Sequence, residues 1–406
     1  MTKTYRTVDS GSSDTDIANF LAWVKANAPA DEEVAANLAF VLARSGETFR
    51  STGGVTADVA STGGPSSLST LLCPLYLRAG GLIVPKLGVP GRPAGGVDCL
   101  AQVQGYRIAL GEDELKSAIR ASGYAHFVAS GRYAPLDARV FKLRQQHNAQ
   151  EVPTLVAASL LSKKLAVGVQ RAGLDVRVAP HGNFGRTWDD ARANAALFVR
   201  AASRHGVHAF PVLTDGAFPY QPFIGRSEAL LALATLFRSN ADPWLESHKR
   251  LCRQLSLAVA PADLRPSINR ATASELKQHF LANLDAQGAS EQAFDVAVRS
   301  CESGHTHTLC AVSDGFASYS LEQIRRIFVK HQESTAATVT SGFPDPLGIV
   351  LLQEPGEWVA QGQPVATARI ATTLDTAQVR RELESALCRP GCQPHGQGIE
   401  GLDEHE

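Results

Sequence analysis

The segment from residue 55 to residue 81 constrains the fold of this chain more than any other stretch. A short apolar run at 55–57 precedes the hydroxyl-rich stretch 58–70, and the apolar run 71–77 follows it. The two consecutive glycines of the middle stretch permit positive φ angles, so a ligand can approach the backbone there. A helix after such a loop presents unpaired N–H groups and the positive end of its dipole. The segment predicts a strand, a loop and a helix with an anion site at the loop, although such capped Gly-Gly turns are also common structural elements.

Strand-like and helical patterns alternate after this segment. Alternation of this kind predicts an α/β fold with a mostly parallel central sheet. The expected strands lie at 81–85, 125–129, 174–178 and 209–215, and the expected helices at 112–121, 189–205, 228–237, 244–255 and 273–284.

Two stretches outside this alternation carry helical patterns alone, one before residue 46 and one at 136–167. We therefore predict two domains, a small all-α domain and a larger α/β domain, with the chain crossing between them three times. Such crossings favour a cleft with a hinge. The predicted boundaries are 1–52 and 134–169 for the helical domain, and 53–133 and 170–345 for the α/β domain.

The C-terminal part has a different pattern of short strands and Gly-containing turns. It predicts a β-meander at 346–388 that belongs to the α/β domain. The polar, Gly-rich tail at 389–406 is expected to be disordered.

Composition limits the possible partners. The 406 residues carry a net charge of −1, which gives no indication of nucleic-acid or membrane-surface binding. No segment has the pattern of a signal peptide or of a membrane span. Seven cysteines, an odd number in a long chain, favour reduced thiols. We expect a cytoplasmic protein.

A second group of candidate residues lies in the helical stretch 136–167. Arg144 lies near the end of one predicted helix, and Ser159 and Lys163 are four residues apart on the next, so these two share a face. Without further context, charges on amphipathic helices are more often simply solvated.

Taken in order, the motifs resemble those of the thymidine and pyrimidine-nucleoside phosphorylases, over roughly residues 15–375. The ordered set is specific although no single motif is decisive. The motifs are Asp-x-x-Ser-Thr-Gly-Gly at 58–64, Gly-Gly-x-Asp at 95–98, Ala-Pro-x-Asp at 134–137 with Arg144, Ala-Ser-Leu-Leu-Ser-Lys-Lys-Leu-Ala at 158–166, Asp-Val-Arg-Val at 175–178 and Leu-Thr-Asp at 213–215.

The resemblance implies two domains that close over a nucleoside and phosphate, and a homodimer formed through the helical domain. It places Arg144, Ser159 and Lys163 on the positions that hold the pyrimidine. Cleavage of the glycosidic bond leaves an anionic base, which two cationic donors would stabilise where it forms. It implies no resident cofactor, with inorganic phosphate or another anionic co-substrate as the second reactant.

The sequence departs from the family at the phosphate site. Val59 and Ala60 stand where family members carry Lys and His. A replacement cation could come from Lys86 or Arg92, and a replacement acid from His181, although a surface histidine is more often without such a role. The phosphate-binding residues that we predict are Ser61, Thr62, Gly63, Gly64, Thr70, Lys86 and Arg92, and the catalytic ones Arg144, Lys163 and His181.

The sequence therefore predicts a pentosyltransferase-like enzyme that cleaves or forms the glycosidic bond of a pyrimidine-type nucleoside or nucleotide. Three alternatives stay open: a phosphoribosyltransferase-type enzyme, a hydrolytic enzyme on a modified nucleoside, and a non-catalytic nucleoside-binding relative.

A Cys/His cluster in the C-terminal part is a candidate metal site. Its spacing matches no common zinc motif, so no metal is predicted. The cluster comprises Cys301, His305, His307 and Cys310, with Cys388, Cys392 and His395 further on.

Overall fold

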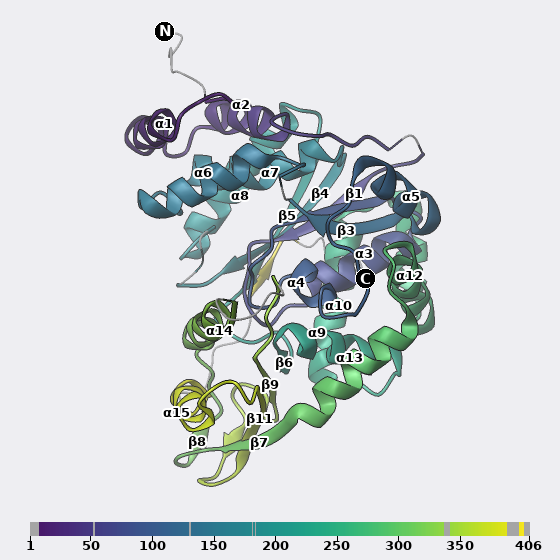
Figure 1. Ribbon diagram of the computed structural model, residues 1–406, viewed down its shortest axis with the longest axis vertical. Coiled ribbons are helices and arrows are strands. Elements are labelled where there is room, and N and C mark those ends of the chain that lie inside the picture. Colours follow the sequence, from purple (N-terminus) through teal and green to yellow (C-terminus); the bar gives the residue numbers. More distant parts are fainter. Residues whose placement is uncertain are drawn as a thin grey trace.

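The computed structural model describes residues 8–51, 53–129, 131–180, 182, 184–336, 342–387 and 398–401 (Figure 1). His181, Cys388, Cys392 and His395 lie outside the described residues. None of the described helices has both the length and the apolarity needed to span a bilayer.

The central sheet is mostly parallel, as predicted. Strands β1 (Ala57–Ser61), β4 (Arg171–Val178) and β5 (His208–Asp215) pair in parallel, and β12 (Ile399–Glu400) adds an antiparallel edge. A second parallel pair, β2 (Val84–Gly88) and β3 (Tyr124–Val128), is joined to the first by a parallel bridge between Thr56 and Ile83.

With this bridge, the parallel strands follow the spatial order β3-β2-β1-β4-β5, so the order reverses between β1 and β4. In open parallel sheets, ligands bind outside the carboxyl ends of the strands at such a reversal. The loop after Ser61 and the end of β4 at Val178 lie at this point.

Helices cover both faces of the sheet (Figure 1), and an apolar core lies on each face. Consecutive residues of a strand point to opposite faces, and Val212 and Leu213 of β5 belong to different cores. The core that contains Leu213 includes α1 (Asp14–Asn27), α2 (Glu32–Ala43), α5 (Glu112–Ser122), α6 (Pro135–Gln146), α7 (Pro153–Ala166) and α8 (Trp188–Ser203). The other includes α3 (Ser69–Ala79), α4 (Gly96–Leu100), α9 (Arg226–Phe237), α10 (Pro243–Val259), α11 (Arg265–Arg270), α12 (Ala273–Ala286) and α13 (Glu291–Gly304), with a 3₁₀ turn at Ala262–Leu264.

The helices of the two stretches predicted to form a helical domain lie together (Figure 1). The side chains of Ser13 and Asp31 accept hydrogen bonds from the first turns of α1 and α2, which fixes where these helices begin. Their apolar core continues into β3 and β4. The domain boundaries themselves stay a prediction.

The C-terminal strands are not connected as the predicted meander. One antiparallel sheet has the order β6-β9-β11-β7, and β10 pairs with β8 in a separate two-stranded sheet. In a meander, β10 would lie between β9 and β11, so the prediction of a simple meander at 346–388 is wrong. The strands are β6 (Phe223–Ile224), β7 (His305–Cys310), β8 (Gly315–Phe316), β9 (Leu347–Leu351), β10 (Trp358–Val359) and β11 (Pro364–Ile370), with helices α14 (Leu321–Ala336) and α15 (Thr376–Leu387).

Two further segments differ from the expectations. Strand β1 begins at Ala57 rather than ending there, so Asp58 and Val59 belong to the strand and not to the loop. In the expected tail, residues 398–401 add β12 to the central sheet, because Ile399 and Glu400 pair with β5.

Candidate functional site

The loop between β1 and α3 has the backbone geometry that the sequence predicts. Gly63 and Gly64 have φ angles of 118° and 115°, and both residues are exposed. The hydroxyl of Ser61 accepts a hydrogen bond from the Gly63 N–H at 3.2 Å. The φ angle of Gly64 favours glycine, and a Cβ atom there would lie 2.7 Å from Nη1 of Arg177, so the loop and this guanidinium approach each other closely.

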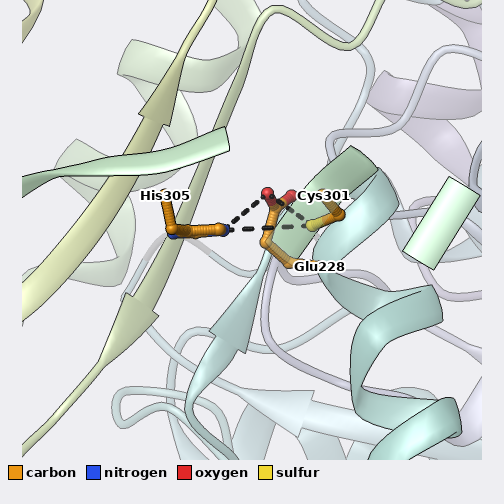
Figure 2. Close-up of side chains that lie close together, drawn as sticks. All are labelled: Glu228, Cys301 and His305. Carbon is orange, nitrogen blue, oxygen red and sulfur yellow. Dashed lines mark hydrogen bonds and ion pairs between the residues drawn. The ribbon is translucent and has the colours of Figure 1, made fainter. Parts of the chain in front are cut away.

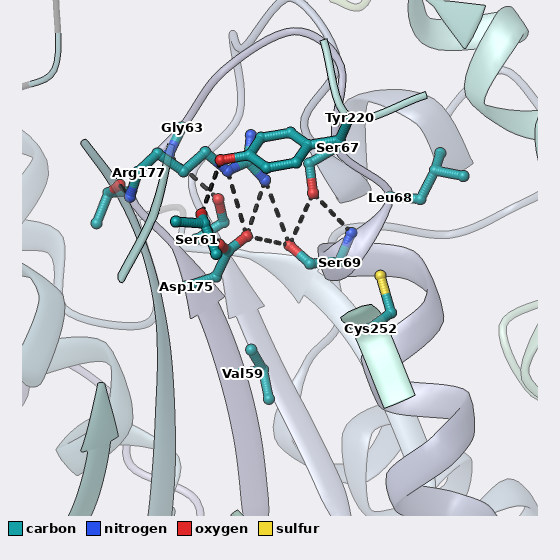
Figure 3. A network of polar contacts seen from close by, with 12 residues as sticks. Val59, Ser61, Gly63, Ser67, Leu68, Ser69, Asp175, Arg177, Tyr220 and Cys252 are labelled. Carbon is teal, nitrogen blue, oxygen red and sulfur yellow. Dashed lines mark hydrogen bonds and ion pairs between the residues drawn. The ribbon is translucent and has the colours of Figure 1, made fainter. Parts of the chain in front are cut away.

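Arg177, near the end of β4, is the cation that faces this loop (Figure 3). Its Nε and Nη2 atoms donate to Oδ2 of Asp175 at 3.2 and 2.8 Å, and its guanidinium lies 5.0 Å from the ring centre of Tyr220. The backbone N–H of Arg177 donates to the Thr62 hydroxyl at 3.0 Å. No described residue accepts a hydrogen bond from Nη1, which therefore has donor capacity for an anion at the loop.

Asp175 connects this arginine to the start of α3. The Ser69 hydroxyl donates to Oδ2 of Asp175 at 2.7 Å. Burial alone would raise the pKa of Asp175, but Arg177 and the Ser69 hydrogen bond outweigh it and hold the pKa below its usual range. The carboxylate is therefore ionised and fixes the guanidinium beside the loop. The Asp175–Val178 motif does not by itself indicate this role, although it ends a parallel strand, where ligands bind in such folds.

Lys86 does not lie free at the loop. Its ammonium group donates to Oδ1 of Asp58 and to the carbonyl of Val59, both at 2.6 Å, and Lys164 pairs with Oδ2 of the same carboxylate. All three charged side chains are buried. Burial would raise the pKa of Asp58, but Lys164 and Lys86 lower it to about 2. This geometry gives the predicted phosphate-binding role of Lys86 no support, because its charge already joins β1 to β2.

Ser159 and Lys163 meet on one face of α7, as their spacing predicts. The ammonium group of Lys163 donates to the carbonyl and hydroxyl of Ser159 at 2.6 and 3.2 Å and pairs with Oδ2 of Asp137 on α6. Oδ1 of Asp137 is buried without a partner among the described residues. The group therefore offers a buried cation, a hydroxyl and a free carboxylate oxygen within one small region.

Arg144 is buried beside this group. Its guanidinium donates to the carbonyls of Gln150 at 2.6 Å and of Ala149 and Leu155 at 3.2 Å each. Burial lowers its pKa to about 10, and Asp137 opposes this shift. Arg144 is therefore charged at neutral pH, with its donors engaged by the connection between α6 and α7.

Arg92, on the loop at 88–93, lies close to Arg144. The guanidinium groups of Arg92 and Arg144 lie 5.8 and 5.9 Å from the ring centre of Phe141. Burial lowers the pKa of Arg92, with a contribution from Arg325. Thr70, the remaining predicted hydroxyl, lies in the first turn of α3 and is partly exposed.

His248 on α10 is a site residue that the sequence analysis missed. Its Nε2 accepts a hydrogen bond from the backbone N–H of Leu68 at 2.8 Å, at the end of the glycine loop. Burial lowers the pKa of His248 to about 3, and Arg177 adds to the shift against Asp175. The ring is therefore neutral and orients the loop as an acceptor.

We expect this histidine to make the protein sensitive to acid. A group whose pKa falls from about 6.5 unfolded to about 3 folded contributes stability that is fully present above pH 6.5 and is lost as the pH falls toward 3. Between pH 7 and pH 5, the native chain should lose about 2 kcal/mol more of its unfolding free energy than a His248→Gln variant. Urea unfolding at both pH values measures this, and exposed His208→Gln is the control. Equal losses in the native chain and His248→Gln contradict the assignment.

No family model matches this chain. The pyrimidine-nucleoside phosphorylase of Staphylococcus epidermidis is 27% identical over 355 residues, which cover 84% of this chain and 81% of the relative. That of Bacillus subtilis is 27% identical over 355 residues, covering 82% and 79%. That of Staphylococcus aureus is 26% identical over 379 residues, covering 88% and 84%.

The similar solved structures are named differently from these sequence relatives. Anthranilate phosphoribosyltransferase from Thermus thermophilus aligns with a TM-score of 0.49 at 16% identity, over 72% of this chain and 90% of that one. The Saccharomyces cerevisiae enzyme of the same name aligns with a TM-score of 0.46 at 12% identity, over 71% and 85%. The sequence relatives confirm the resemblance on which the motifs were interpreted, and the chain is a divergent relative of the pyrimidine-nucleoside phosphorylases.

Proposed function

We propose that the chain is a pentosyltransferase-like enzyme that cleaves or forms the glycosidic bond of a pyrimidine-type nucleoside or nucleotide. The observation that carries this proposal is the group formed by the buried Lys163 and Asp137 with the partly buried Ser159, beside Arg144. These are residue types that recognise the polar edge of a heterocycle, and Arg144, Ser159 and Lys163 occupy the positions that hold the pyrimidine in the resemblance.

The group suits the charge that develops in the reaction. As the glycosidic bond breaks, negative charge moves onto the carbonyl oxygens of the base, where Lys163 and Arg144 would donate. Ser159 would donate to the base edge, and the unpartnered Oδ1 of Asp137 would accept from a ring N–H. Arg144 would give up a hydrogen bond to a backbone carbonyl in order to donate to the base. Since a charged acceptor binds a guanidinium more strongly than a neutral carbonyl does, this exchange is most favourable with the anionic leaving group.

The second reactant would be an anion held at the Gly63-Gly64 loop. The side chain of Val59, at the position of the family lysine, is fully buried in the apolar core and offers no charge. We propose that Arg177 replaces that lysine, since its Nη1 faces Gly64 and its other nitrogens are fixed by Asp175. A guanidinium binds phosphate or another oxyanion through two parallel hydrogen bonds.

We further propose that the protein acts in the cytoplasm as a homodimer formed through its helical segments. Domain closure would bring the base-binding group and the anion site at the glycine loop together. Sedimentation equilibrium of the full chain tests the dimer. A single species with the mass of one chain across the micromolar range contradicts it.

The proposed activity is tested by following free base. The full chain is incubated with thymidine, uridine and their monophosphates, with and without phosphate. Base release only with phosphate supports phosphorolysis through the anion site, and release without it indicates hydrolysis. Binding of a nucleoside by calorimetry without any product favours the non-catalytic alternative, which the engaged donors of Arg144 would suit.

We expect Arg177→Gln to weaken phosphate binding about 10- to 100-fold, because a charge-assisted hydrogen bond contributes about 1.5–3 kcal/mol. Arg177→Lys keeps the charge and should stay within about tenfold of the native affinity. Isothermal titration with phosphate measures both, and exposed Arg186→Gln is the matched control. Native affinity in a folded Arg177→Gln variant would show that the loop binds anions without this side chain.

A further inference from the structure

Three potential metal-binding atoms converge between the central fold and the C-terminal sheet (Figure 2). Glu228 lies in the first turn of α9, Cys301 in the last turn of α13, and His305 at the start of β7. Glu228 and Cys301 are buried and His305 is partly so. Cys301 and His305 are four residues apart in the sequence, whereas Glu228 lies 73 residues before Cys301, so the fold brings the carboxylate to the other two side chains.

Donors crowd around a single oxygen atom in this cluster. Oε1 of Glu228 accepts from Nε of Arg369 at 2.7 Å, while Cys301 Sγ and His305 Nε2 approach it at 3.3 and 3.2 Å. A carboxylate oxygen has two lone pairs. Since Arg369 uses one of them, the thiol and the imidazole both face the other. An ion between the three atoms would satisfy the oxygen, the sulfur and the nitrogen together.

The separations fit one tetrahedral centre. Zinc bonds of about 2.0–2.3 Å to oxygen, nitrogen and sulfur place neighbouring ligand atoms about 3.3–3.6 Å apart. The pairs in the structure are 3.3 Å for oxygen and sulfur, 3.2 Å for oxygen and nitrogen, and 3.9 Å for sulfur and nitrogen. The longest of these has to shorten by a few tenths of an ångström, which side-chain rotation can supply.

The surroundings orient these atoms in the way that metal ligands are usually oriented. Nδ1 of His305 lies 3.2 Å from the Thr367 hydroxyl, which fixes the ring with Nε2 directed at the cluster. Both oxygens of Glu228 bind Arg369, at 2.7 and 3.0 Å. A Cβ atom at Gly348 would lie 1.8 Å from the carboxylate carbon of Glu228, so this glycine leaves the space that the carboxylate fills.

We propose that Glu228, Cys301 and His305 bind one divalent transition-metal ion, with Zn²⁺ preferred and water in the fourth position. The mixture of thiolate, imidazole and carboxylate is typical of zinc. Binding forms a metal–sulfur bond and breaks the S–H bond of Cys301, whose proton passes to water, with no change of oxidation state. The ion would join α9 and α13 to the C-terminal sheet independently of the proposed catalytic site.

Charge is balanced in the loaded cluster. The negative groups would be Glu228, the Cys301 thiolate and Asp345, whose Oδ2 lies 2.7 Å from Arg369 Nη2, and the positive ones Arg369 and the divalent ion.

The proposed ligand set also differs from the Cys/His cluster at 301–310 that the sequence suggests. Of its members, Cys301 and His305 contribute, but His307 and Cys310 do not belong to the group, and Glu228 supplies the third ligand from 73 residues before Cys301.

Cobalt titration of the full-length chain, purified in the presence of a chelator that is then removed, tests the site. We expect one Co²⁺ per chain, a near-ultraviolet charge-transfer band from the thiolate, and loss of the band when Zn²⁺ is added. Cys301→Ser should abolish the band and weaken Zn²⁺ binding at least about 100-fold, while Cys310→Ser, a neighbouring cysteine outside the cluster, should change neither.

Absence of the thiolate band in the native chain, or its persistence in Cys301→Ser, overturns the proposal. If Cys301→Ser does not fold, X-ray absorption of the zinc-loaded native chain decides. One sulfur at about 2.3 Å with nitrogen and oxygen neighbours supports the site, and a shell without sulfur overturns it. Glu228 is left unchanged in these variants, because its removal would take away one of the two carboxylates that pair with Arg369 in the interior.

Discussion

Replacing Lys163 by alanine is expected to lower kcat/KM for release of a pyrimidine base by about 10²- to 10³-fold. The ammonium group is buried between Asp137 and Ser159, so water cannot substitute fully for it. The base becomes anionic only as the glycosidic bond breaks, and a donor aimed at that charge acts mainly on the transition state. We therefore expect kcat to fall more than KM rises.

The matched control is Lys142→Ala, since Lys142 is exposed on α6 and should leave kcat/KM within about twofold. Because Lys163→Ala leaves Asp137 buried without its partner, circular dichroism must first show a folded protein. The double variant Lys163→Met, Asp137→Leu removes both charges together and should be equally inactive. A folded Lys163→Ala protein with native kcat/KM would refute the role of this lysine.

Replacing Asp58 by asparagine is expected to lower the unfolding free energy by about 3–5 kcal/mol. Asp58 is fully buried and pairs with two ammonium groups, those of Lys86 and Lys164. Without the carboxylate, two positive charges remain in the interior with only dipoles to oppose them. The same change should loosen the glycine loop, because Asp58 lies in the strand that leads into it.

Urea unfolding measures this loss, and Asp14→Asn is the control, because Asp14 pairs with Arg139 at the surface and should contribute less than about 1 kcal/mol. Adding Lys164→Met to Asp58→Asn removes one of the two unpaired charges and should restore part of the stability. An Asp58→Asn protein as stable as the native chain would show that water or a protonation change compensates for the charges.

Much of the fold follows from local patterns in the sequence. The periodicity at 16–26, 136–146 and 189–205 predicts helices that the structure contains as α1, α6 and α8, because one apolar stripe per helix faces a core. The alternation of strands and helices predicts the parallel sheet, because helices that alternate with strands connect parallel strands and pack on the faces of the sheet. The four-residue spacing of Ser159 and Lys163 likewise places them in contact, since helical geometry alone decides it.

Where the sequence prediction is wrong, contacts between distant segments made the difference. Short strands such as β8 and β10 have no pattern of their own that indicates their partners, so the order of the C-terminal sheet could not be predicted. Lys86 looked like a free cation near the loop, but Asp58 and the Val59 carbonyl engage it across 28 and 27 residues.

The sequence by itself determined the helices and the glycine loop, because each depends on spacing within a short segment. It also determined the parallel sheet and the family to which the chain is related, because each depends on the order of such segments along the chain. Only the tertiary structure decided which charges are free. It engages Lys86 and Lys164 in the interior, directs Arg177 at Gly64, and brings Glu228 to Cys301 and His305. The reason is physical: a buried charge must find its partner through packing, and the sequence states neither the burial nor the partner.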